Sequence, residues 1–250
     1  MTWKAVGLKV CIQLTLQPVE LMIEDPPLLT LKRNINRPSK DKVSALSRAS
    51  TGVLVDCLGG RAALDQSIKP MSPHATSFAG VALTCDAGPA DNLAVFGAIH
   101  LAESGDVIII ATDAFMGTAV VGDLVVGMAR NNGVNAVVTD GCVRDIEGID
   151  KTGLPCFAAG VSPDSPARNG PGSAGLPITV AGVRVQSGDI IVGDRDGVVV
   201  VPRERIDEMI AKLDAVLAAE AELDSEVANG LKMAGFADEI LKSDRVSWVD

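Results

Sequence analysis

Short runs of apolar residues alternate with helix-like stretches through the middle of the chain. Two stretches, 92–104 and 122–133, have the length and the composition of helices, and the second ends on a glycine. The runs around them are rich in β-branched residues, as buried strands are: GVALTCD (80–86), DVIIIAT (106–112), NAVVTDG (135–141) and PCFAAG (155–160). Strands that are joined by helices usually pair in parallel. The pattern predicts an α/β fold with central βαβ units and a mostly parallel sheet.

Further elements are predicted on both sides of this centre. Residues 41–50 and 51–60 indicate two short helices, the second ended by Gly59-Gly60, and a turn follows at 70–73. Residues 162–177 are rich in Pro, Gly and Ser and predict a loop that is able to wrap a site or a neighbouring subunit. The runs ITVAGVRV, GDIIVGD and GVVVVP then predict three short strands that form a β-rich layer.

The C-terminal region has the spacing of one long amphipathic helix. Acidic residues separate apolar residues that recur every three or four positions, namely Ile206, Met209, Ile210, Leu213, Val216 and Leu217. The helix is expected to begin near Arg203 and to end near Gly230. Since it is longer than one small domain requires, we expect it to pack on another subunit.

The N-terminal region shows no such pattern. Residues 24–40 contain Pro26-Pro27 and Arg37-Pro38 among mixed charges and predict an irregular segment. We therefore expect an irregular extension over 1–38 and a single domain over 39–250, whose helical tail begins at about 203. The first 21 residues match no motif, so Met22 is a candidate translation start. The sequence shows neither a secretion signal nor an apolar run long enough to span a membrane, which predicts a cytoplasmic protein.

Composition and charge narrow the functional classes. Of 250 residues, 47% are hydrophobic, which suffices for a folded core, but only 3% are aromatic. The net charge of −10 opposes binding to a phosphate backbone, so direct nucleic-acid binding is not expected. The five cysteines are odd in number and lack CxxC spacing, which argues against both a zinc site and a disulfide framework.

Two segments, GDL (122–124) and DGCVRD (140–145), carry the candidate chemistry. They lie on either side of one predicted helix and the strand after it, and ligands collect where the strands of such sheets end. Gly122 begins the helix, so the N–H groups beside it suit a carboxylate. Arg144 can stabilise negative charge on a 2-oxo group, Asp145 can hold a metal ion, and Asp123 can act through water or relay a proton. Because the candidate ligands are oxygens, Mg²⁺ fits better than Zn²⁺.

The same residues also suit a structural role. Asp123 would then be the N-cap of its helix, and Arg144 and Asp145 would form an ion pair. Their spacing alone does not separate the two hypotheses. The Gly-Asp and Asp-Gly pairs at 188–189, 193–194 and 196–197 are predicted to form tight turns rather than ligand sites.

Three separated stretches resemble one protein family. The run GDLVVGMARNNGVNAVVTDGCVRD is similar to the signature of the 4-hydroxy-4-methyl-2-oxoglutarate aldolase / regulator of ribonuclease activity A family, also called RraA-like. VDCLGG around Asp56 and GDIIVGDRDGVVVVP from Gly188 to Pro202 agree with it, and the resemblance covers roughly residues 41–220. It implies a swivelling β/β/α fold, assembled as a homotrimer or hexamer with active sites between subunits.

The resemblance also implies an activity and a set of site residues. The family's aldolases cleave 4-hydroxy-4-methyl-2-oxoglutarate and 4-carboxy-4-hydroxy-2-oxoadipate to pyruvate and a second oxo acid, and they decarboxylate oxaloacetate with a divalent metal. By motif, the backbone of Gly122, Asp123, Leu124 and Val125 would bind the substrate carboxylate. Arg144 would contact the carbonyl oxygen, Asp145 would ligate Mg²⁺ or Mn²⁺, and Asp123 would act through water. A glutamate from a neighbouring chain's C-terminal helix completes the family's site, with Glu220 and Glu222 as candidates here.

Two alternatives to this lyase remain open from the sequence. Family members also include non-catalytic regulators that bind and inhibit a ribonuclease, and a shared fold does not separate the two roles. The retained set Gly122, Asp123, Arg144 and Asp145 favours an enzyme. The third possibility is a lyase that acts on another oxo acid.

Overall fold

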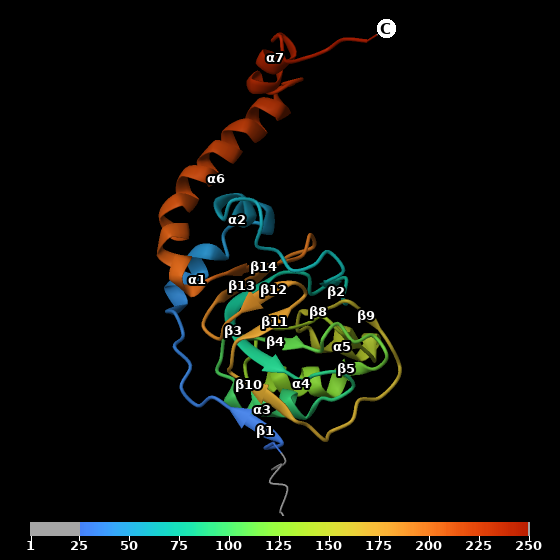
Figure 1. Cartoon of the computed structure of the whole chain (residues 1–250). Coiled ribbons are helices and arrows are strands. Elements are labelled where there is room, and N and C mark those ends of the chain that lie inside the picture. The colour runs from blue at the N-terminus through green and yellow to red at the C-terminus, as the bar shows by residue number, and fades with distance from the viewer. Residues whose placement is uncertain (1–25, 250) are drawn as a thin grey trace, which may run out of the picture.

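A nine-stranded mixed sheet forms the centre of the computed structural model, which describes residues 26–249 (Figure 1). Its main path runs in the order β1-β10-β3-β4-β6-β8-β2, and β13 joins it through β3 and carries β14 on its other side. The strands of this sheet are β1 (Leu29–Leu31), β2 (Lys69–Pro70), β3 (Phe78–Asp86), β4 (Asp106–Ala111), β6 (Ala136–Thr139), β8 (Cys156–Ala158), β10 (Gly172–Ala174), β13 (Ile190–Gly193) and β14 (Val198–Val201).

Four neighbouring strands of this sheet, β3, β4, β6 and β8, pair in parallel, as the sequence predicted. The helices between them are α3 (Leu93–Leu101), α4 (Asp123–Asn131) and α5 (Ile146–Thr152). All six residues of β4 are buried because both faces of the sheet are covered. Ile108 and Ile110 pack into the core that includes Val126 of α4, whereas Val107 and Ile109 pack on the opposite side. The mixed α/β fold and its βαβ centre are confirmed.

A second, smaller parallel sheet lies beyond the central strands. It consists of β5 (Ala119–Val121), β7 (Cys142–Val143) and β9 (Gly160–Val161), in the order β5-β7-β9. Each follows a strand of the central sheet along the chain, and β5 and β7 lead directly into α4 and α5. These strands are too short to stand out in the sequence, and they were not predicted.

The remaining elements cover the other face and one end of the central sheet. The hairpin of β11 (Ile178–Val180) and β12 (Val183–Val185) packs on the face that includes Val107. The helices α1 (Lys40–Leu46), α2 (Thr51–Cys57) and α6 (Ile206–Ala228) pack on β13 and β14. A 3-10 turn at Arg203–Arg205 precedes α6, and α7 (Gly235–Leu241) follows it. The predicted helices at 41–50, 51–60 and 203–230 are therefore confirmed.

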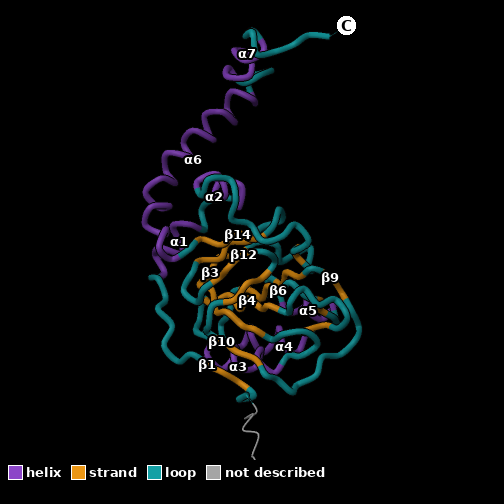
Figure 2. The backbone as a smooth tube through the Cα atoms, viewed as in Figure 1, coloured by secondary structure: helices purple, strands orange, loops and turns teal. Residues whose placement is uncertain are grey.

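The C-terminal helix α6 leaves the domain partway along its length. Its buried residues, Ile206, Met209 and Leu213, are all in its first half, and residues 218–228 are exposed. Figure 2 shows the rest of α6 and all of α7 projecting from the domain. Within the described residues, no helix combines the length and the apolar character that a membrane span requires.

Three expectations from the sequence were wrong. The region 24–40 contains β1, which pairs in parallel with β10, so the domain begins before Ser39. β10 itself lies within 162–177, which was expected to be only a loop. The run ITVAGVRV forms two strands instead of one, because Ala181 and Gly182 both adopt positive φ and close a tight hairpin. The candidate start Met22 lies outside the described residues.

The Gly-Asp pairs at 188–189 and 193–194 have the structural role that was predicted for them. Asp189 is buried and accepts hydrogen bonds from the N–H groups of Gln186 (2.8 Å) and Arg203 (3.0 Å). Asp194 accepts two from Thr51, one from its N–H (2.8 Å) and one from its hydroxyl (2.7 Å), and so joins the β13-β14 turn to the start of α2. Both carboxylates satisfy backbone donors at chain reversals.

Candidate functional site

The small sheet brings the two sequence segments together. Because β5, β7 and β9 are parallel neighbours, the residues that follow them lie at one edge. Gly122 follows β5, and Arg144 follows β7 with its N–H donating to the Val121 carbonyl at 3.1 Å. The loop that follows β9 begins at the same edge, where the Ser162 N–H donates to the Val143 carbonyl at 3.0 Å. Three chain segments therefore converge on one site.

A pocket of about 160 Å³ opens at this edge. This is smaller than the roughly 300 Å³ at the lower end for drug-sized ligands, so the pocket suits a small molecule. Its lining includes every predicted site residue from Gly122 to Val125, as well as Arg144 and Asp145. The other lining residues come from α3, β5, α4 and the loop after β9: Asn92, Phe96, Ala119, Val120, Val121, Met128, Ser165, Pro166 and Arg168.

Gly122 leaves room for the charged groups of the pocket. A Cβ atom at this position would lie 2.6 Å from the Asp145 Oδ2 atom and 3.2 Å from the Arg144 Cγ atom. Its backbone is extended, with φ of −131°, a conformation that any residue adopts. A larger residue here would therefore displace the Asp145 carboxylate, so glycine is favoured for space and not for backbone freedom.

Arg144 and Asp145 form the charged centre of the pocket. The Arg144 Nε atom lies 3.3 Å from the Asp145 Oδ2 atom, and the Arg144 Nη1 atom donates to the Ser165 hydroxyl at 2.5 Å. Asp145 has a left-handed backbone, with φ of +59°, and its side chain does not cap α5, which begins at the next residue. The carboxylate lies instead against Gly122 and Arg144. The ion pair of the structural hypothesis is thus present, but it lies inside a pocket.

The start of α4 supplies unpaired N–H groups to the same pocket. Gly122 is the N-cap, so the alternative that Asp123 caps this helix is wrong. The Asp123 Oδ1 atom accepts from the Leu124 N–H at 2.7 Å. Within the described part of the chain, the N–H groups of Asp123 and Val125 have no acceptor. Two donors at the positive end of the helix dipole therefore remain for an anion.

The position of Asp123 depends on a second glycine. Its carboxylate lies beside Gly148 in α5, where an added Cβ atom would overlap the Asp123 side chain. Asp123 is thus wedged between α4 and α5 at the edge of the pocket. Neither glycine could be assigned this packing role from the sequence.

The oxygen ligands of the pocket fit a hydrated divalent cation. Among residues 26–249, no group of three His, Cys, Asp or Glu side chains could hold a metal. Mg²⁺ commonly binds through one or two carboxylates and completes its shell with waters and substrate oxygens. Asp145, with Asp123 nearby on the pocket wall, meets this requirement, whereas a site formed by protein ligands alone does not fit.

Three polar residues of the pocket were not assigned from the sequence: Asn92, Ser165 and Arg168. Ser165 and Arg168 lie in the loop that was expected to wrap a site. Asn92 begins α3 and is 3% exposed. Its Nδ2 atom donates to the Val120 carbonyl at 3.1 Å, and its Oδ1 atom is buried without a donor among the described residues. The only sequence signal was an Asp-Asn pair before a helix, which usually indicates a cap.

The first part of the DGCVRD segment is structural. The buried Asp140 carboxylate accepts from the Thr112 N–H at 2.7 Å and from the Ala114 N–H at 3.2 Å. Gly141 packs against Thr112, and Cys142 is buried. Burial raises the pKa of the Cys142 thiol, as is typical of structural cysteines.

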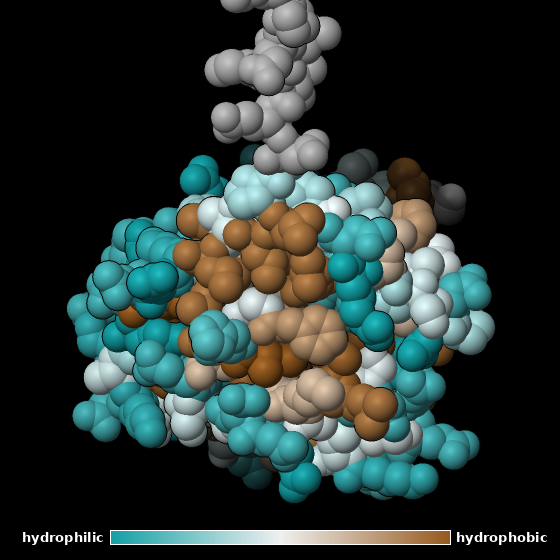
Figure 3. All heavy atoms as spheres, turned by 90° about the horizontal axis from the view of Figure 1, so that it is seen from below, coloured by the Kyte–Doolittle hydropathy of each residue, from teal (hydrophilic) through white to brown (hydrophobic). Residues whose placement is uncertain are grey.

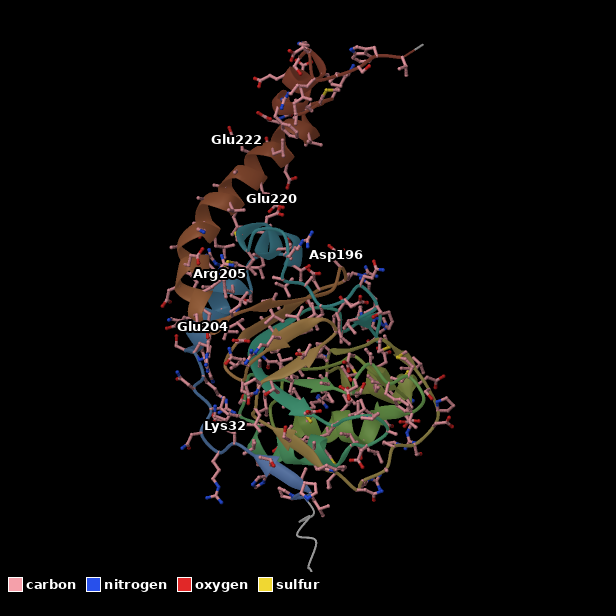
Figure 4. The ribbon with its side chains drawn as sticks, in the orientation of Figure 1. Lys32, Asp196, Glu204, Arg205, Glu220 and Glu222 are labelled. Atoms are coloured by element: carbon pink, nitrogen blue, oxygen red, sulfur yellow. The ribbon has the colours of Figure 1, made fainter. Side chains whose placement is uncertain are left out.

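The two C-terminal glutamates do not line this chain's own pocket. Glu220 and Glu222 are exposed on the projecting part of α6 (Figure 4). Apolar residues on the same projection are also exposed, among them Leu223 and Val227.

Apolar side chains are exposed at the pocket. Seen from the end of the molecule that carries β1, α3 and α4, brown side chains form a continuous area (Figure 3). At the pocket, Leu124 is 75% exposed and Met128 is 46% exposed. Exposed patches of this kind mark surfaces that contact other molecules.

Comparison with known proteins places this site in a family context. The RraA-like family model, described as Aldolase/RraA, matches residues 43–200. A protein of Halalkalibacterium halodurans named "Putative 4-hydroxy-4-methyl-2-oxoglutarate aldolase" is 34% identical over 172 residues, which are 69% of this chain and 81% of that protein. The matched region of the family model includes every residue that lines the pocket.

Two solved structures share the fold. An uncharacterized protein from Pseudomonas syringae pv. tomato superposes with a TM-score of 0.70 at 25% identity, over 80% of this chain and 93% of the other. The RNA-processing inhibitor RraA from Thermus thermophilis superposes with a TM-score of 0.56 at 29% identity, over 62% of this chain and 93% of the other.

Proposed function

Because this chain belongs to the RraA-like family, we propose that its pocket is the active site of a divalent-metal-dependent lyase that releases pyruvate. Its substrates are 2-oxo acids of the 4-hydroxy-4-methyl-2-oxoglutarate and 4-carboxy-4-hydroxy-2-oxoadipate type, and it also decarboxylates oxaloacetate. The name of the 34% identical relative supports the substrate class. The observation that carries the proposal is the convergence of free N–H donors, a guanidinium and a carboxylate around Gly122, which is unnecessary for a purely structural ion pair.

The start of α4 binds the carboxylate next to the 2-oxo group. The N–H groups of Asp123 and Val125 donate to its oxygens, and the helix dipole stabilises its charge. This contact places the 2-oxo oxygen near Arg144, which lines the same small pocket.

Arg144 stabilises the charge that develops during bond cleavage. When the bond between C3 and C4 breaks, its electron pair moves through C3 and C2 to the 2-oxo oxygen. The 4-hydroxyl loses its proton and becomes the carbonyl of the second oxo acid. The guanidinium donates to the 2-oxo oxygen, while Asp123 accepts the hydroxyl proton through a water molecule. C3 then takes up a proton from water to give pyruvate, and Asp123 releases the hydroxyl proton to water.

Asp145 is the residue that would hold Mg²⁺ or Mn²⁺. When bound, the cation supplies Lewis-acid polarisation of the 2-oxo group. The room that Gly122 leaves beside Oδ2, and the absence of a capping bond from Asp145 to α5, support this role.

The functional unit in this proposal is a homotrimer or hexamer. The projecting part of α6 carries exposed apolar residues, and apolar side chains are also exposed at the pocket, so both surfaces would be covered by other copies of the chain. In such an assembly Glu220 or Glu222 of one copy would complete the site of a neighbour. The mass of the purified protein in solution, measured by analytical ultracentrifugation, tests this assembly.

The proposed activity predicts pyruvate release that depends on a metal. Purified protein is expected to form pyruvate from 4-hydroxy-4-methyl-2-oxoglutarate and from oxaloacetate with Mg²⁺, and to lose this activity in EDTA, because polarisation of the 2-oxo group then disappears. Pyruvate is measured through a coupled lactate dehydrogenase assay, with free Mg²⁺ restored after EDTA as the control. Absence of pyruvate from both compounds would contradict the proposal.

Gly122→Ala is expected to impair the site without unfolding the domain. The added methyl group would displace the Asp145 carboxylate, while the extended backbone accepts alanine. Displacement of a catalytic group by about 1 Å can lower turnover on the order of a hundredfold, which steady-state kinetics and Mg²⁺ titration would detect.

Gly127→Ala is the matched control in the same helix. A Cβ atom there meets nothing within 4 Å, so this change is expected to retain activity and to raise stability slightly, since alanine favours helices over glycine. Equal activity of the two variants would argue against the role of Gly122.

A ribonuclease-binding role is the second candidate function. The similarity to the RNA-processing inhibitor RraA and the exposed apolar surface favour it, because the regulator hypothesis needs a protein-binding surface and no reaction. Metal-dependent pyruvate release would favour the lyase, whereas its absence together with inhibition of a ribonuclease would favour the regulator.

A further inference from the structure

The pocket contains a second arginine, which the roles proposed above leave unused. Arg168 lies in the loop after β9 and lines the pocket with Arg144. Arg144 is engaged by Asp145 and Ser165. Within residues 26–249, Arg168 forms no ion pair. A guanidinium without a carboxylate partner at the wall of a binding pocket is suited to an anionic ligand.

The backbone on either side of Arg168 is held in place. The Ala167 N–H donates to the Ala90 carbonyl at 2.7 Å, and the Ala167 carbonyl accepts from the Asn92 N–H at 3.1 Å. On the other side, the Asn169 N–H donates to the buried Asp91 carboxylate at 2.6 Å. The segment that carries Arg168 is therefore hydrogen-bonded to the start of α3. These bonds fix the position of the Arg168 backbone relative to the pocket.

Asn92 is a second polar residue on the wall of the pocket that carries Arg168. Asn92 lines the pocket and is only 3% exposed. Its amide oxygen has no hydrogen-bond donor among the described residues. The bond from its Nδ2 atom to the Val120 carbonyl fixes which end of the amide is the acceptor. A buried acceptor without a donor is costly, so Asn92 is unusual among the polar residues of this wall.

The charges of the pocket indicate how many negative groups the ligand carries. Its ionisable lining residues are two arginines, Arg144 and Arg168, and two aspartates, Asp123 and Asp145, so their charges cancel. A divalent cation then leaves two positive charges. A 2-oxo acid with at least two carboxylates compensates both of them, whereas a monocarboxylate leaves one uncompensated.

We propose that Arg168 binds the second carboxylate of the substrate and so selects dicarboxylic 2-oxo acids over monocarboxylic ones. This inference rests on the proposed function. The first carboxylate lies at the start of α4, the 2-oxo group at Arg144, and the distal carboxylate at Arg168. The loop after β9 is then a specificity element and not only a cover of the site.

The test compares two ligands of equal chain length that the enzyme does not cleave. These are 2-oxoglutarate and 2-oxopentanoate, in which a methyl group replaces the second carboxylate. Their dissociation constants are measured with Mg²⁺ by isothermal titration calorimetry on the full chain. Unaltered protein is expected to prefer 2-oxoglutarate, and Arg168→Gln is expected to reduce this preference by about 10- to 100-fold, as for a lost hydrogen bond between charged groups.

Two further variants control for charge and folding. Arg184→Gln changes the net charge equally on an exposed position of β12 outside this pocket and should keep the preference. Arg168→Lys keeps the positive charge and should retain part of the preference for 2-oxoglutarate. An unchanged preference in Arg168→Gln would overturn the inference and leave the proposed site intact. Failure of the unaltered protein to bind either ligand would instead overturn the proposed function.

Discussion

Asp145→Asn is expected to abolish metal-dependent pyruvate release while leaving the fold and the assembly intact. Asparagine has the same size and tolerates the left-handed backbone of this position. It lacks the negative charge that would hold Mg²⁺ beside Gly122. Because Lewis-acid polarisation contributes several kcal/mol, we expect turnover to fall by about a thousandfold or more. Steady-state pyruvate formation and Mg²⁺ binding by calorimetry measure the two losses separately.

Glu147→Gln provides a control for this loss of charge. Glu147 is exposed in α5, two residues from Asp145, and does not line the pocket. The variant should retain both activity and Mg²⁺ affinity. Near-normal turnover of Asp145→Asn, with the dependence on Mg²⁺ unchanged, would show that the metal assignment is wrong.

Arg144→Lys is expected to reduce turnover nearly as strongly. The guanidinium contacts Asp145 through Nε and Ser165 through Nη1, and it has further N–H groups for the 2-oxo oxygen. A lysine ammonium is a compact charge that cannot reproduce this planar set of donors. Loss of one preorganised donor to a developing oxyanion lowers turnover by about 100- to 1,000-fold, and kcat should fall more than KM changes.

Arg130→Lys is the corresponding control. Arg130 is exposed near the end of α4 and lies outside the pocket, so this exchange should leave kinetics unchanged. If Arg144→Lys retained turnover within a few-fold, the guanidinium would not be the group that stabilises the 2-oxo oxygen. Thermal unfolding of both variants establishes that any loss is not caused by instability.

The sequence predicted the elements that have strong local signals. The β-branched runs at 106–112 and 135–141 form β4 and β6, and the spacing from Ile206 to Leu217 forms α6. Such patterns are legible because a strand buried on both faces and an amphipathic helix each impose a residue pattern along the chain. β1 and β10 were missed because three-residue strands carry no pattern, and their pairing joins segments far apart in the sequence.

The candidate site also combines residues that the sequence indicates with residues that only the folded chain brings together. The sequence alone predicted Gly122, Asp123, Arg144 and Asp145 as candidate site residues, because glycine at a helix start and an Arg-Asp pair after a strand have recognisable chemistry. That these residues share one pocket follows from the three-dimensional fold, because the short strands β5, β7 and β9 align three loop starts at one edge. The fold also adds Asn92 and Arg168, which lie more than seventy positions apart in the sequence. Their segments are joined by a backbone hydrogen bond at Ala167 and by bonds to the Asp91 carboxylate. Contacts between such distant segments depend on how the sheets pack, and no local residue pattern encodes them.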